Sequence, residues 1–175
     1  MAGKRTFTQT VGRLWRHRWQ DEADTRRAIP DDLVERLARR VAASEQRHSG
    51  EIRLYVEAGL PTSYILRGAT PRERAISMFA KLRVWDTASN NGVLIYLLLA
   101  EHAIEIVADR GLASRVPENE WKAIVQRMGT AFRERRFEQG LTQALEEVSA
   151  LLVAHFPVAA GEANPNELPN EPILG

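Results

Sequence analysis

Asn90-Asn91-Gly92 leads into an unbroken apolar run, Val-Leu-Ile-Tyr-Leu-Leu-Leu, at residues 93–99. A second strand-like segment, Ile-Glu-Ile-Val-Ala-Asp, follows after a few residues, at 104–109. A strand with one face in water alternates apolar and polar residues, whereas the first run is apolar at every position. It therefore predicts a central strand covered by helices on both faces. The second segment predicts its hairpin partner, with the turn near Glu101-His102.

The segments around this hairpin have the periodicities of one further strand and of helices. Ile52, Leu54 and Val56 alternate with charged or polar neighbours, which predicts a strand at residues 51–57. The sequence Thr-Pro-Arg-Glu at 70–73 has the pattern of a helix capping box with proline at the first helical position. Apolar stripes at helical spacing predict helices at about residues 31–47, 70–85, 117–132 and 137–156.

The order of these segments is helix, strand, helix, hairpin, helix, helix, which predicts an α/β fold. The first strand reaches the second through a helix, which favours a right-handed parallel crossover, and the third strand adds antiparallel. We therefore predict an α/β/α sandwich with a small mixed β-sheet. The residues of helix 70–85 expected to face the core are Ala75, Met78, Phe79, Leu82 and Trp85.

Composition divides the chain into a basic arm (1–29), a domain (30–157) and a proline-rich tail (158–175) that is expected to lack regular structure. In the arm, Phe7, Val11, Trp15 and Trp19 recur every four positions, which is typical of a short amphipathic helix. Two interpretations stay open: the helix docks on its own domain or a sister subunit, or it lies on an anionic membrane surface. The arm residues predicted to contact a membrane or partner are Phe7, Arg13, Trp15, Arg16 and Trp19.

Composition also argues against several classes of protein. The net charge of +1 gives no support to nucleic-acid binding, and the chain has no cysteine for a disulfide, a thiol nucleophile or a thiolate metal site. The N-terminus lacks the apolar segment of a secretory signal. The run at 92–100 is much shorter than the roughly 20 residues that span a bilayer, so no transmembrane segment is predicted. We expect a soluble, cytoplasmic protein.

Polar residues gather at one end of the predicted hairpin. An antiparallel pair places the start of its first strand beside the end of its second, and this brings Asn90 and Asn91 close to Asp109. Carboxylate and amide oxygens suit a hard cation such as Ca²⁺. The predicted metal ligands are Asp86, Asn90, Asn91 and Asp109, with Arg110, Glu118 and Glu120 around the rim. The alternative is that Asn-Gly is only a turn that needs a left-handed backbone.

Over about residues 33–156 the chain resembles the TPM domain family. The resemblance is carried by the stripe of helix 70–85, the stretches 91–95 and 104–111, Trp121, Phe137-x-x-Gly140-Leu141, Phe156-Pro157 and the Asn-Glu-Leu-Pro of 166–169. It implies an α/β/α sandwich. The family includes thylakoid-lumen acid phosphatases linked to photosystem II repair and bacterial calcium-binding proteins. Such members carry aspartates in the loop before the Asn-Gly strand, whereas residues 86–90 keep only Asp86.

The resemblance and the residues together predict a non-catalytic interaction module. Its arm would contact a membrane surface or a membrane-associated protein partner. The alternative is a metal-dependent, calcium-binding acid phosphatase that uses the hairpin end, although no catalytic residue is identified. The four histidines stand apart without metal-ligand spacing, and each is expected to be structural.

Overall fold

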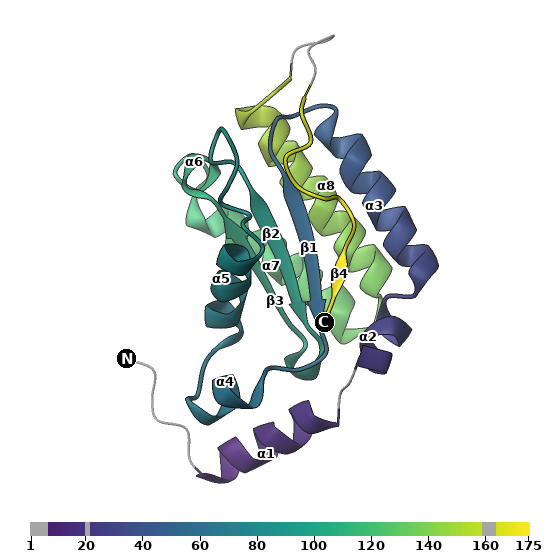
Figure 1. Cartoon of the computed structure of the whole chain (residues 1–175), viewed down its shortest axis with the longest axis vertical. Helices are drawn as coiled ribbons and strands as arrows, with labels where there is room; N and C mark the ends of the chain where they lie inside the picture. Colours follow the sequence, from purple (N-terminus) through teal and green to yellow (C-terminus); the bar gives the residue numbers. More distant parts are fainter. Residues whose placement is uncertain (1–6, 20–21, 159–163) are drawn as a thin grey trace.

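The computed structural model describes residues 7–19, 22–158 and 164–175. Figure 1 shows a sheet between two layers of helices, with the N-terminal helix along the lower edge of the molecule. The elements in chain order are α1 (Phe7–Arg18), α2 (Glu22–Ala28), α3 (Asp31–Glu45), β1 (Ile52–Glu57), α4 (Thr62–Leu66), α5 (Pro71–Lys81), β2 (Val93–Leu98), the 3-10 turn η1 (Leu99–Glu101), β3 (Ala103–Ala108), α6 (Arg110–Ala113), α7 (Glu118–Arg133), α8 (Phe137–His155) and β4 (Ile173–Leu174).

The sheet has the strand order β3-β2-β1-β4. Strand β1 runs parallel to β2, and β2 pairs antiparallel with β3 in the predicted hairpin. Every residue of β2 is buried, as its apolar sequence predicts for a strand covered on both faces. The predicted α/β class and mixed sheet are confirmed.

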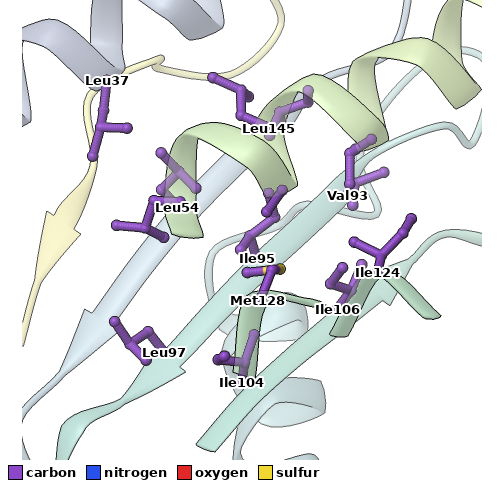
Figure 2. Packing of buried hydrophobic residues seen from close by; sticks show 14 of the residues in the cluster. Leu37, Leu54, Val93, Ile95, Leu97, Ile104, Ile106, Ile124, Met128 and Leu145 are labelled. Atoms are coloured by element: carbon purple, nitrogen blue, oxygen red, sulfur yellow. The ribbon is translucent and has the colours of Figure 1, made fainter. Parts of the chain in front are cut away.

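Two apolar clusters fill the space on either side of the sheet. The larger cluster joins one sheet face to α3, α7 and α8, and the smaller joins the other face to α4 and α5. In Figure 2, Ile95 and Ile106 from the sheet lie beside Ile124 and Met128 of α7, with Leu145 of α8 above them. Burying each such side chain contributes about 1.5–3 kcal/mol, so these contacts dominate the stability of the sandwich.

The helix predicted at 70–85 is shorter than expected. Its start is confirmed, because Thr70 and Glu73 form the predicted capping box. It ends at Lys81, and Arg83 has a positive φ of 56°, which no helix interior accommodates. The turn buries Val84 and leaves Trp85 48% exposed. The prediction that Trp85 faces the core is therefore wrong.

The prediction that the tail lacks regular structure is also wrong at its end. Ile173 and Leu174 form β4, which pairs in parallel with Tyr55 and Val56 of β1. Gly175 extends the pairing, since its N–H donates to the Val56 carbonyl at 2.8 Å and its carbonyl accepts from the Ala58 N–H at 2.9 Å. The pattern of prolines misled the prediction, because residues 173–175 contain none and keep their backbone donors.

Candidate functional site

The loop 86–92 before β2 forms one end of the hairpin. Asn90 has a left-handed backbone with a φ of 52°, as the predicted turn requires. A Cβ atom on Gly92 would lie 1.9 Å from the carbonyl oxygen of Val84, so only glycine fits there. The loop is thus pressed against the end of α5 and held in one shape.

Across the hairpin, Asp109 and Arg110 meet this loop as predicted. The Arg110 guanidinium donates to Asn90 Oδ1 at 3.0 and 3.2 Å. Asp109 caps α6, because its Oδ1 accepts from the Arg110 N–H at 2.7 Å. Asp109 Oδ2 is buried and has no hydrogen-bond partner among the residues that the structure describes.

Asn91 lies below the rim and is completely buried. Its Nδ2 donates to Ser49 Oγ at 3.2 Å, and its N–H donates to Thr87 Oγ1 at 3.1 Å. Its side-chain oxygen, Oδ1, accepts no hydrogen bond within the described part of the chain. A buried acceptor without a donor costs about 1–3 kcal/mol, which singles out Asn91 Oδ1 and Asp109 Oδ2 as the unusual atoms of this end.

The other predicted residues turn away from these atoms. Asp86 forms an ion pair with Arg83 at 2.5 Å, and Glu118 pairs with Lys122 along α7 at 2.9 Å. Glu120 is exposed on the same helix. Among residues 7–19, 22–158 and 164–175, no group of three or more His, Cys, Asp or Glu side chains is placed to hold a metal ion.

Sequence reasoning missed a carboxylate that the tail brings to this loop. The Glu167 side chain accepts from the Ala88 N–H at 3.0 and 3.3 Å. The buried carboxylate of Glu51 holds this part of the tail in place. It accepts hydrogen bonds from the backbone N–H groups of Glu167 at 3.0 Å and of Leu168 at 3.2 Å. The one available signal was the Asn-Glu-Leu-Pro motif, which shows no periodicity.

These contacts decide how well a cation would fit. Ca²⁺ takes six to eight oxygens. Two side-chain oxygens, on Asn91 and Asp109, are buried without a partner among the described residues. The Asn91 side chain contacts Ser49 before β1, whereas Asp109 caps α6 after β3, and backbone carbonyls and solvent would have to supply most of the shell. The residues therefore fit a weak calcium site at most.

A hollow of about 1250 Å³ lies elsewhere, between α2, α3 and α8. Its central arginine is already neutralised, because Arg36 donates to Glu138 at 3.0 Å and to Asp32 at 2.6 Å. A ligand in this hollow would bury little apolar surface. The charged side chains that line it have both signs and pair with one another, so they would not select a ligand by its charge.

The arm docks on its own domain through polar residues. His17 and Arg13 are buried, and both reach the Glu101 carboxylate of η1. His17 Nδ1 accepts from the Leu60 N–H at 2.9 Å, so its proton is on Nε2 and is donated to Glu101 Oε1 at 2.9 Å. We call Arg13, His17, Leu60 and Glu101 the arm lock.

The aromatic stripe of the arm faces outward. Trp15 is 63% and Trp19 72% exposed, and their rings stack with centroids 5.9 Å apart. Beside them a groove of about 560 Å³ runs between α1 and α4, lined by Val11, Leu14, Trp15, His17, Trp19, Leu60, Thr62 and Ile65. We call Val11, Trp15 and Trp19 the tryptophan face. Arg13, predicted with that face, points inward instead, and the side chains of Phe7 and Arg16 lie outside the described residues.

Comparison with known proteins supports the predicted family. A family model described as the TPM domain matches residues 23–151. The solution structure of BA42 protein from the psychrophilic bacterium Bizionia argentinensis is 26% identical, with a TM-score of 0.70 over 81% of this chain and 91% of that one. The N-terminal domain of a protein from P. gingivalis shares the fold, with 17% identity and a TM-score of 0.55 over 80% and 94% of the two chains. The curated proteins include no match.

Proposed function

The chain belongs to the TPM domain family, and from this premise we propose that it is a non-catalytic interaction module that docks at a membrane through α1. The observation that carries the proposal is the tryptophan face. Contiguous exposed apolar surface marks an interaction site more often than a single exposed residue does, and here Trp15 and Trp19 stack on one another at the C-terminal end of α1. The domain would supply a rigid base, and the arm would supply the contact.

The arm lock explains how such a face is kept ready. A helix as short as α1 is marginal in water by itself, since helices below about 12–15 residues form poorly alone. The buried pairs of His17 and Arg13 with Glu101 hold it against η1. The face is consequently presented without having to fold on contact.

None of the described helices is long and apolar enough to cross a bilayer. Membrane association would therefore depend on the surface of the domain and on its partners there. The predicted cytoplasmic location and a membrane-associated protein partner belong to this proposal and stay predictions.

The proposal is tested by fractionating cells that produce the full chain or the double variant Trp15→Ser/Trp19→Ser. We expect the full chain in the membrane fraction and the variant in the supernatant, with unchanged circular dichroism. Trp85→Ser is the matched control, because Trp85 is also exposed but lies in the turn that follows α5. Equal partitioning of all three proteins would contradict the proposal.

A second candidate is a calcium-dependent phosphatase at the hairpin end, and one observation favours it. Asn91 Oδ1 and Asp109 Oδ2 are buried acceptors that a cation would satisfy. Bound Ca²⁺ would polarise a phosphoryl oxygen or lower the pKa of its water. The Asp109 and Asn91 side chains would hold the ion, and the Arg110 guanidinium would stand beside the substrate's negative charge.

Calorimetric titration with Ca²⁺ tests this candidate. Weak extracellular-type sites bind at about 0.1–1 mM, and we expect this range for the native chain. Asp109→Asn should abolish binding, whereas Asp86→Asn should retain it, because Asp86 is paired with Arg83. Hydrolysis of a phosphate ester would then be assayed with and without Ca²⁺. Heat that is unchanged in Asp109→Asn would place any bound ion elsewhere.

A further inference from the structure

We propose that the surface recognised by the tryptophan face is the anionic lipid bilayer itself. This inference rests on the proposed docking at a membrane and names what is bound there. The indole rings of Trp15 and Trp19 would enter the headgroup region, and α1 would lie in the plane of the membrane. A short helix with one aromatic face and basic neighbours is suited to that position.

The first argument is charge. Residues 1–20 contain no aspartate or glutamate, and neither do residues 58–72, which include α4 on the other side of the groove. Arg13 is buried against Glu101, Arg67 pairs with Glu73 at 3.5 Å and Arg72 pairs with Glu105 at 3.5 Å. The sequence of the arm adds Lys4, Arg5, Arg16 and Arg18, with no acidic residue among them. In a chain with 24 basic and 23 acidic residues, the helices α1 and α4 are distant in sequence and in contact in the structure, and neither contains an acidic residue. Such a surface complements negative headgroups.

The second argument is the kind of apolar surface. Tryptophan has an apolar ring with a polar N–H, and it is favoured at the boundary between lipid and water. Trp15 and Trp19 present two such rings side by side. On the neighbouring helix α4, Leu66 is 65% exposed. In the sequence, arginines at 16 and 18 alternate with the tryptophans, as they do in helices that lie on anionic membranes.

The third argument is the orientation of the helix. The arm lock uses the side of α1 that carries Arg13 and His17, which leaves the side of Trp15 and Trp19 free of the domain. Figure 1 shows α1 at the edge of the molecule beside α4, away from the layer formed by α3, α7 and α8. A flat surface can therefore approach α1 without meeting the rest of the sandwich.

The test is sedimentation of the full chain with vesicles of phosphatidylcholine that contain 30% phosphatidylglycerol, against vesicles of phosphatidylcholine alone. We expect at least tenfold stronger binding to the anionic vesicles and a clear loss at 0.5 M NaCl. Trp15→Ser/Trp19→Ser should bind at least tenfold more weakly, and the control Trp85→Ser should bind as the native chain does. Circular dichroism and thermal unfolding establish that each variant is folded.

The outcomes separate this inference from the proposed function. The folded chain could fail to sediment with either kind of vesicle while its recovery in the membrane fraction of cells still requires Trp15 and Trp19. That result would overturn lipid recognition and leave the docking proposal standing. If neither assay depends on these tryptophans, both are overturned. Light scattering is run beside the vesicles, and a dimer that Trp15→Ser/Trp19→Ser dissociates would overturn lipid recognition in favour of a second copy of this chain.

Discussion

His17 and Glu101 lie 84 residues apart in the sequence and 2.9 Å apart between Nε2 and Oε1. The Leu60 N–H donates to the other ring nitrogen of His17, which fixes the tautomer that donates to the carboxylate. The side chains of Arg13 and His17 in the arm, the backbone N–H of Leu60 in the β1–α4 connection and the Glu101 carboxylate of η1 thus form one polar unit. The arm is held by specific hydrogen bonds, and its apolar side is left available.

Acid should weaken this attachment. Burial would raise the pKa of Glu101, but the hydrogen bonds from His17 and Arg13 outweigh it and lower the pKa from 4.5 to about 2. The stability that ionised Glu101 contributes is complete above pH 4.5 and is lost as the pH falls towards 2. At 1.36 kcal/mol per pKa unit, the loss amounts to roughly 3 kcal/mol. Urea unfolding of the native chain and of Glu101→Gln at pH 6 and pH 3 should capture about 2 kcal/mol of this loss. Identical pH slopes for the two proteins would contradict the assignment.

Alkaline pH should act through Glu45. Burial raises the pKa of this carboxyl from 4.5 to about 8, so the folded state keeps a proton that the unfolded chain has lost. Its contribution to stability is complete below pH 4.5 and is lost as the pH rises through 8. Glu45→Gln should therefore gain roughly 2–4 kcal/mol over the native chain at pH 9 and little at pH 4.5. Thermal unfolding across this range tests it; a constant difference between the two proteins would show that Glu45 does not titrate this way.

Substitution of Gly92 should be severely destabilising. An added Cβ would lie 1.9 Å from the Val84 carbonyl oxygen, which belongs to the backbone and cannot rotate away. We expect Gly92→Ala to cost at least about 3 kcal/mol. Gly129→Ala is the control, since its Cβ would meet only Arg133 Nη1 at 3.7 Å, and alanine in this helix should stabilise by about 0.5–1 kcal/mol. Chemical denaturation compares them, and similar midpoints would refute the steric argument.

The tail should protect the hairpin loop from exchange. Glu51 accepts two backbone N–H groups of the tail, and Glu167 accepts the Ala88 N–H. Glu51→Ala should remove both acceptors and release the segment, whereas Glu167→Ala should expose only the Ala88 amide. Hydrogen exchange followed by NMR distinguishes them: we expect faster exchange at 88, 167 and 168 in the first variant and at 88 alone in the second. Unchanged protection at 88 in both variants would mean that the tail does not cover the loop.

The fold was largely predictable because its signals are local. The apolar run of β2, the capping box of α5 and the stripes of α7 and α8 each specify one element from adjacent residues. The prediction that Trp85 faces the core was wrong because the left-handed backbone of Arg83 ends the helix before the apolar stripe reaches Trp85. Strand β4 was not predicted, because a segment of two residues shows no periodicity and forms a strand only by pairing with β1.

The candidate site was less predictable because its contacts are long-range. Hairpin geometry correctly brought Asn90 to Arg110. Asp86 is the local exception, because its partner Arg83 lies only three residues earlier. Nothing near Glu167 in the sequence indicates that its side chain reaches the N–H of Ala88, 79 residues earlier. The amphipathic arm shows the same limit. The stripe of Phe7, Val11, Trp15 and Trp19 predicts an apolar face of the helix, but it does not predict that Arg13 and His17, on the opposite face, bind Glu101 of the domain.

The hydrogen bond from the Glu167 N–H to the Glu51 carboxylate also has a consequence for synthesis of the protein. These residues are 116 positions apart, and a ribosome adding roughly 5–20 residues per second needs about 6–23 s to make the second after the first. During that interval the outer edge of β1 has no β4 beside it, and an open strand edge invites pairing with other chains. The yield of folded protein should therefore depend on how fast the segment that leads to β4 is translated and on whether a chaperone shields the nascent sheet meanwhile.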